Sequence, residues 1–86
     1  MKTNHLMLRE LLDSYHPKKR GFLSKEEYEL INETLCLNEM NIVALRNLRD
    51  YTVVSMARSE KMEDLDRISA ITHCIDLKII ELGGEV

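Results

Sequence analysis

An apolar stripe in the last third of the chain strongly restricts how the protein can fold. The six residues of the stripe follow one another at alternating steps of three and four positions: Leu65, Ile68, Thr72, Ile75, Ile79 and Leu82. This spacing places them along one side of an α-helix, and only Thr72 is polar. Two glycines follow directly, and glycine commonly ends a helix. The pattern predicts a C-terminal helix that lies against other helices.

The apolar face of this helix is wider than the stripe alone. Its second flank is formed by Ala70, Ile71, Cys74, Leu77 and Ile80. A helix that is apolar over more than half of its circumference needs neighbours on two sides. We expect the chain's own helices on one side and a second copy of the chain on the other. The six stripe residues are therefore predicted to carry self-association into a dimer or a higher homo-oligomer.

Two shorter helices are expected in the first half of the chain. In residues 4–15 apolar side chains recur at helical spacing, and Pro17 follows, which disfavours continuation of the helix. Near residue 24, Ser24 and Glu27 have the spacing of a capping box, so a second helix is predicted to run from there to residue 37. Asn38 and Asn41 mark its end, because asparagine suits both a left-handed helix end and a new N-cap.

A third helix is expected over residues 41–58, and the C-terminal helix is expected to begin near Ser59. The segment between them contains no glycine or proline, so one long bent helix is an alternative. A β-branched trio at residues 52–54 favours a strand locally, but helical spacing surrounds it. The prediction is a single all-α domain over residues 1–86, built as a small bundle of three to four helices.

The composition narrows the class of protein. The chain has 86 residues and a formal net charge of −3, which disfavours a nucleic-acid binder because such proteins usually carry a basic excess. The sequence contains no apolar run of about 18 residues and no signal-peptide pattern, so we expect a cytoplasmic protein without membrane association. Cys36 and Cys74 are then expected to be reduced thiols.

The sequence contains no catalytic or metal-binding motif. His73 and Cys74 are adjacent and point about 100° apart on a helix, so they cannot share a metal ion. Asp66, Ser69, His73 and Asp76 share one helical face, but a single ridge offers neither an oxyanion hole nor a pocket. We interpret the ridge as a solvated edge or an interface rim, and we predict no catalytic residue, metal or cofactor.

The general character of the chain resembles small accessory regulators of temperate phages and mobile elements, such as antirepressors that disable a repressor protein. This resemblance implies a non-enzymatic protein that binds and inhibits another protein. The predicted partner-binding residues are exposed groups of the basic connection after the first helix and of the third predicted helix: Lys18, Lys19, Arg20, Phe22, Arg46, Arg49 and Tyr51. Tyrosine, phenylalanine and arginine are the types among them that are enriched at interfaces.

Two other functions fit the same sequence. An antitoxin, immunity protein or secretion chaperone would also act by binding a protein. A small DNA-binding regulator would instead use the basic loop at residues 18–20 and the arginines of the third predicted helix, Arg46 and Arg49. The acidic residue Glu39, in the turn before that helix, would then face the phosphates.

Overall fold

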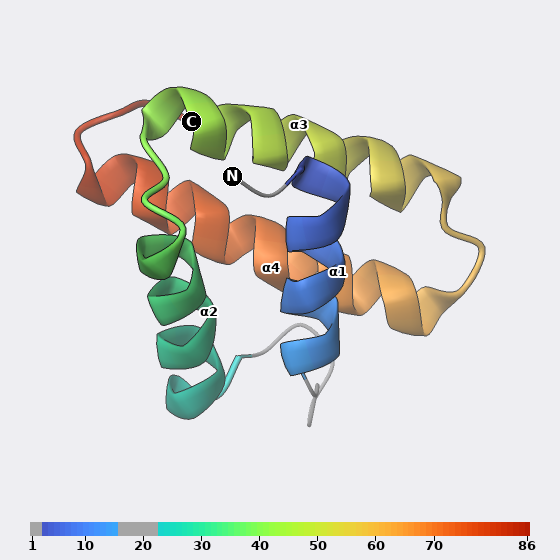
Figure 1. Ribbon diagram of the computed structural model, residues 1–86. Coiled ribbons are helices and arrows are strands. Elements are labelled where there is room, and N and C mark those ends of the chain that lie inside the picture. The colour runs from blue at the N-terminus through green and yellow to red at the C-terminus, as the bar shows by residue number, and fades with distance from the viewer. Residues whose placement is uncertain (1–2, 16–22) are drawn as a thin grey trace.

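The computed structural model describes residues 3–15 and 23–86, and within them it consists of helices and connections without a strand. The four helices are α1 (Asn4–Ser14), α2 (Lys25–Leu37), α3 (Ile42–Arg58) and α4 (Met62–Glu81) (Figure 1). The prediction of a small all-α fold is confirmed.

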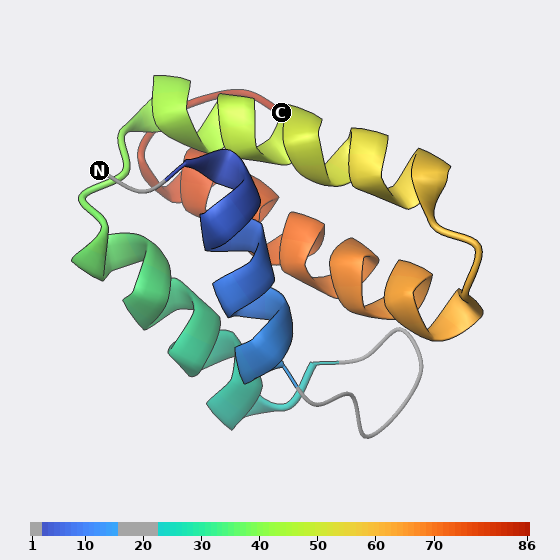
Figure 2. The same cartoon turned by 45° about the vertical axis from the view of Figure 1, so that its right-hand side comes forward.

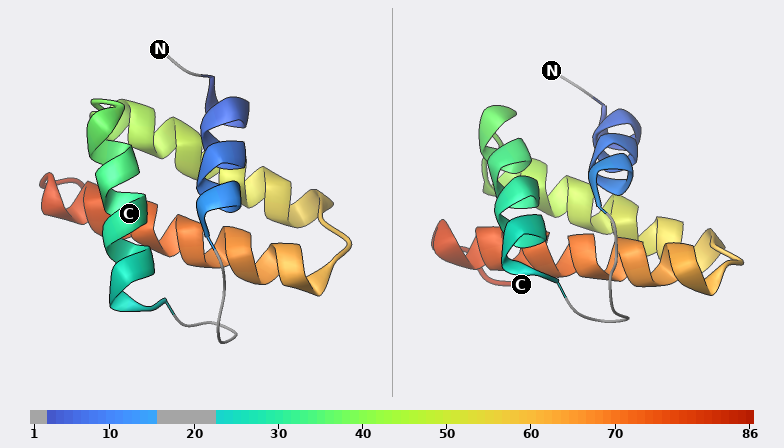
Figure 3. Two further views of the ribbon diagram at one scale, coloured as in Figure 1. Left: turned by 60° about the horizontal axis from the view of Figure 1, so that its bottom comes forward. Right: turned by 90° about the horizontal axis from the view of Figure 1, so that it is seen from below.

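The helices form two crossed pairs. α3 and α4 run antiparallel and make the most extensive helix–helix contact in the described part of the chain. α1 and α2 also run in opposite directions, and both lie across the α3–α4 pair (Figure 2). α1 contacts both α3 and α4, whereas α2 packs against α4 and α1 but not against α3 (Figure 3). No helix of the described residues covers the side of the α3–α4 pair that faces away from α1 and α2.

Side-chain caps fix three of the four helix starts. The Thr3 hydroxyl accepts a hydrogen bond from the backbone of Leu6 at the start of α1. At the start of α2 the expected capping box is formed, with Ser24 and Glu27 each accepting from the other's backbone N–H at 3.2 and 3.3 Å. Asn41 accepts from Ala44 at 2.8 Å and begins α3. Local sequence thus sets where these helices begin.

The third and fourth predicted helices are separate. α3 ends at Arg58 with Ser59 as its C-cap, and α4 begins at Met62, three residues later than expected. The one-helix alternative is wrong, because both helices carry apolar faces that become buried when the chain reverses. α4 has no side-chain cap at Lys61, but Glu63 and Asp64 lie in its first turn, where the helix dipole favours acids.

The predicted stripe lies largely in the core of the single chain. Ile75 and Ile79 have no exposed surface, and Ile68 and Thr72 are 5% and 7% exposed. Ile75 and Ile79 belong to one core cluster with buried residues from the other three helices, including Leu11, Leu45, Leu48, Ile31 and Leu35. The periodicity identified a buried face correctly, but in the folded chain its own helices cover most of that face.

Thr72, the polar member of the stripe, has a partner on α3. Its hydroxyl oxygen lies 2.8 Å from the Thr52 hydroxyl oxygen and 2.8 Å from the Ile68 carbonyl. The Thr52 hydroxyl in turn donates to the Arg49 carbonyl at 2.7 Å. Both hydroxyl groups are buried, and both are hydrogen-bonded, as buried polar groups need to be. The threonine pair therefore fixes the register of α3 against α4.

The two cysteines are predicted to differ sharply in reactivity. Cys36 is exposed on α2, whereas Cys74 is buried on α4, and burial raises the pKa of the Cys74 thiol to about 11. Alkylation at neutral pH should modify Cys36 quickly and Cys74 only when the fold opens, because the thiolate is the reactive form. Mass spectrometry of partially labelled protein would measure both rates. Equal rates would contradict the burial of Cys74.

The raised pKa of the Cys74 thiol also predicts how the stability of the fold changes with pH. The folded state holds the Cys74 thiol neutral, and its pKa lies above the reference value of 9.0. Its contribution to stability is complete below about pH 9 and is lost as the pH rises towards 11. Cys74→Ala should remove this part of the alkaline destabilisation, which denaturant unfolding at several pH values would show.

Candidate functional site

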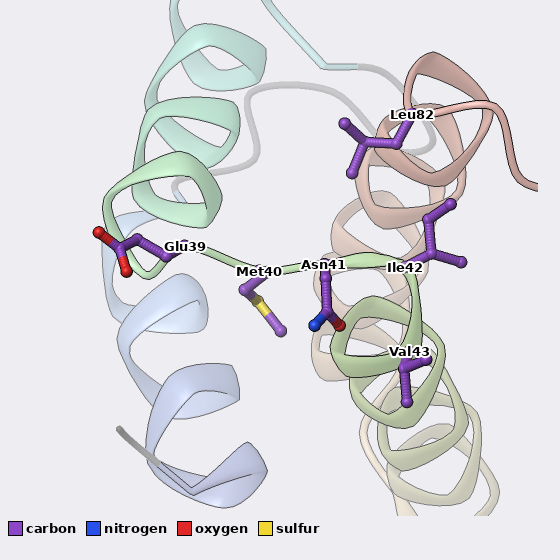
Figure 4. A pocket seen from close by; sticks show the side chains of 6 residues that line it. All are labelled: Glu39, Met40, Asn41, Ile42, Val43 and Leu82. Carbon is purple, nitrogen blue, oxygen red and sulfur yellow. The ribbon is translucent and has the colours of Figure 1, made fainter.

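A shallow apolar hollow lies at one end of the bundle, where the turn between α2 and α3 meets the end of α4. We call it the end hollow (Figure 4). Its volume is about 510 Å³. It is lined by Glu39, Met40, Asn41, Ile42, Val43 and Leu82. Val43 is 68% exposed and Leu82 is 45% exposed, so large apolar side chains face solvent there. Met40 and Ile42 also line the hollow; they are half-buried and pack against the hydrophobic core.

The α2–α3 turn is shaped by a residue in the left-handed conformation. Glu39 has a φ of 51°, and its N–H donates to the Cys36 carbonyl at 3.0 Å. Sequence reasoning considered asparagine for this role, but Asn38 keeps a negative φ and uses its side-chain amide to donate to the Thr34 carbonyl at 2.8 Å. Asn41 takes its expected alternative role as the N-cap of α3.

Replacing Glu39 with glycine is expected to stabilise the fold by roughly 0.5–1 kcal/mol. Left-handed backbone costs a residue with a side chain about 1–2 kcal/mol, and the greater freedom of glycine in the unfolded chain offsets part of this gain. Glu33→Gly is the matched control, since Glu33 is an exposed residue within α2 and the change should destabilise. Urea unfolding of both variants would measure the difference, and a destabilised Glu39→Gly variant would refute the expectation.

The other wall of the end hollow is fixed by the glycines that end α4. Gly83 has a φ of 88°, and its N–H donates to the Ile80 carbonyl, while the Gly84 N–H donates to the Ile79 carbonyl. This is the Schellman arrangement. A side chain at residue 84 would bring its Cβ within 2.8 Å of the Ile79 Cγ2 methyl and 3.3 Å of the Ile42 side chain. Both glycines thus hold Leu82 at the edge of the hollow.

The end hollow is suited to receiving an apolar group rather than to catalysis. Its one charged lining residue is Glu39, and in Figure 4 the Glu39 carboxylate points away from Leu82. The interior is therefore bounded by apolar side chains and by the Asn41 amide. A general acid–base mechanism requires positioned titratable groups, which this lining does not provide. Exposed apolar surface of this kind is typical of protein–protein contact.

The structure divides the predicted self-association residues into two groups. The four that are buried have no surface to offer a second copy of the folded chain. Leu65 is half-buried near the start of α4, and Leu82 belongs to the end hollow. Self-association itself stays a prediction, and contact between folded copies would have to use exposed residues of α4 such as Ile80.

The predicted partner-binding residues fall into three groups. Lys18, Lys19, Arg20 and Phe22 lie outside the described residues. Arg49 forms an ion pair with Asp76 of α4, and Arg46 donates to the Glu85 carbonyl at 2.8 Å. Tyr51 is half-buried, and its hydroxyl is hydrogen-bonded to Nδ1 of His5 at 2.6 Å. The structure does not bring Arg46, Arg49 and Tyr51 together, because Tyr51 faces α1 and the arginines face α4 and its tail.

The polar residues that the sequence places on one face of α4 do not share one environment. Asp76 is engaged by Arg49, while Ser69 and His73 are exposed. In the described residues, no group of three or more His, Cys, Asp or Glu side chains converges as a metal site. Over the same residues, no helix has both the length and the apolar character needed to cross a membrane.

Sequence reasoning missed the end hollow because its walls are far apart in the chain. Val43 is out of phase with the buried face of α3, and this exposed apolar position at a helix start was the available signal. Leu82 was assigned to the stripe. The left-handed Glu39 could not be inferred, since two asparagines near it suited that conformation better.

The fold and the hollow together define a small helical protein with an apolar depression on its surface. Beyond this class the comparisons add nothing: the chain matches no protein-family model, no curated protein and no solved structure.

Proposed function

We propose that this protein is a small non-enzymatic regulator that binds and inhibits another protein through the end hollow. The observation that supports this most is the exposure of Val43 and Leu82, which line one depression together with the half-buried Met40 and Ile42. An apolar anchor from a partner would bury both exposed side chains. Central apolar pockets of this type commonly supply much of the binding energy of an interface.

The most concrete form of the proposal is an antirepressor that acts on a DNA-binding repressor in the cytoplasm. It rests on the resemblance of the chain's general character to small phage and mobile-element regulators. An antitoxin, immunity protein or secretion chaperone would use the same kind of surface. The genes that neighbour this one would separate these versions, because each type is encoded beside a characteristic target.

The alternative of direct DNA binding has less support. A helix-turn-helix reader packs its two helices together, whereas α2 and α3 are not in contact. Arg49 is paired with Asp76, and an arginine that contacts phosphate would have to give up that partner. Homo-oligomerisation remains part of the main proposal, and sedimentation equilibrium at tens of micromolar protein would measure it.

The test of the proposed function is a quantitative affinity capture from the native host with wild-type and variant protein. The variant Val43→Glu/Leu82→Glu places two charges in the end hollow, and Val54→Glu places one on an exposed apolar site of α3 that does not line it. We expect wild type and Val54→Glu to capture the same repressor. The hollow variant should lose it by about thirty-fold or more, which corresponds to roughly 2 kcal/mol.

Two results would contradict this function. One is undiminished capture by Val43→Glu/Leu82→Glu, provided that its circular dichroism matches the wild type. The other is recovery of nucleic acid without protein, together with binding that weakens steeply as salt increases, which would favour the DNA-binding alternative.

A further inference from the structure

A second depression, separate from the end hollow, lies between α1, α3 and the first turns of α4. We call it the α1 groove, and its volume is about 490 Å³. Its polar lining consists of His5, Arg9, Asp13, Tyr51, Ser55, Asp64 and Arg67. His5 of α1 and Tyr51 of α3 meet edge to face with ring centroids 6.1 Å apart. Their hydrogen bond joins the two helices and holds the aromatic part of the groove in place.

The charged side chains of the groove are not paired with one another. Within the described residues, no hydrogen bond or ion pair engages Arg9, Asp13, Asp64 or Arg67. The Nε atom of Arg67 is also shielded from solvent and lacks an acceptor. A buried unsatisfied donor costs about 1–3 kcal/mol, and more when it is charged.

An acceptor from outside the chain would reach this donor once the Arg67 side chain turns towards the groove, and the lining of the groove restricts what kind of acceptor fits. Two arginines face a ligand there, but Asp13 and Asp64 line the same groove, so the fixed charges cancel. Both aspartates repel a dianionic phosphate more strongly than they repel a singly charged carboxylate. A carboxylate carries one charge in a plane that matches the guanidinium fork. Leu8 and Ile68 also line the groove and suit the methylene groups of an acidic side chain.

We propose that the α1 groove binds an aspartate or glutamate side chain of a partner protein, with Arg67 as the main donor and Arg9 as the second. The site does not depend on the end hollow, so either surface can fail its test without deciding the other. If both are used, the partner presents an apolar anchor and an acidic residue to two faces of the bundle.

The experiment is a titration of ¹⁵N-labelled protein with N-acetyl-glutamate amide, followed by nuclear magnetic resonance. The Arg67 Nε–Hε resonance should shift with saturation in the millimolar range, as expected for one carboxylate. N-acetyl-glutamine amide is the matched probe, since it differs only by replacing the carboxylate with a neutral amide. It should give a shift at least tenfold smaller at the same concentration.

Variants then assign the site, with the backbone amides of α1 as the readout. Arg67→Gln should abolish saturable binding, Arg67→Lys should retain a weaker form, and Arg9→Gln should weaken it several-fold. Arg58→Gln is the control, because Arg58 is exposed at the end of α3 and does not line the groove. Since Arg9 is exposed, its variant tests the proposal even if changes at Arg67 disturb the fold.

Three outcomes would overturn the proposal. The first is the absence of a saturable shift with the glutamate probe. The second is an equal response to the glutamine probe, which would show that charge is not recognised. The third is saturable binding of inorganic phosphate without binding of the glutamate probe, which would assign the groove to a different oxyanion.

Discussion

Ile75→Asp is expected to unfold the protein rather than to separate an oligomer. Ile75 is fully buried among residues of all four helices. An unpaired carboxylate there would cost more than about 4 kcal/mol, which approaches the whole stability of a domain of this size. Far-UV circular dichroism at 25 °C should show the loss of most helical signal, and size-exclusion chromatography should show an expanded chain.

The matched control is Ile80→Asp, on the same helix but 56% exposed. It should leave the helical signal unchanged and shift the unfolding midpoint only slightly. A different result would revise the fold. If Ile75→Asp kept full helicity and only halved the molecular mass, the stripe would be an interface between copies. α4 would then not be a core helix of the single chain.

Thr72→Leu is expected to destabilise the protein by about 2 kcal/mol. The stripe seen in the sequence suggests the opposite, because leucine would complete an apolar seam. In the structure Thr72 lies against Thr52 of α3 with the two hydroxyl oxygens 2.8 Å apart, so a larger side chain would push the helices apart. Overpacking of this kind costs about 1–3 kcal/mol. Urea unfolding with a two-state fit would measure it.

Thr72→Val separates the steric effect from the lost hydrogen bond. Valine has nearly the shape of threonine, so the variant should lose only about 1 kcal/mol, and Thr52 keeps its bond to the Arg49 carbonyl. The order of stability should be wild type, Thr72→Val and then Thr72→Leu. A leucine variant more stable than wild type would mean that the space beside Thr52 is open.

The helices could be predicted from the sequence because their signals are local. The capping box at Ser24, the N-cap at Asn41 and the glycines after Leu82 each act through neighbouring residues. The stripe on α4 likewise predicted a buried face. Periodicity cannot say what covers such a face, since α1, α2, α3 or a second chain would require the same spacing.

The surface depressions and the ion pair between α3 and α4 could not be predicted in the same way, because they depend on tertiary contacts. Arg49 and Asp76 were assigned to separate surfaces, but the antiparallel α3–α4 pairing brings them together. The α1 groove joins Arg9 with Arg67, which are 58 positions apart in the sequence. Tyr51 was identified as an interface residue, and it does line that groove, although its hydroxyl is directed to His5.

The short connection between α3 and α4 has a consequence for the order of folding. Only residues 59–61 separate the two helices, so closing this loop costs little chain entropy. Contacts that are close in sequence form quickly, and we expect the α3–α4 hairpin to be the first stable unit. α1 and α2 leave the ribosome earlier but have only each other to pack against. Their apolar faces remain available to chaperones until the hairpin has emerged.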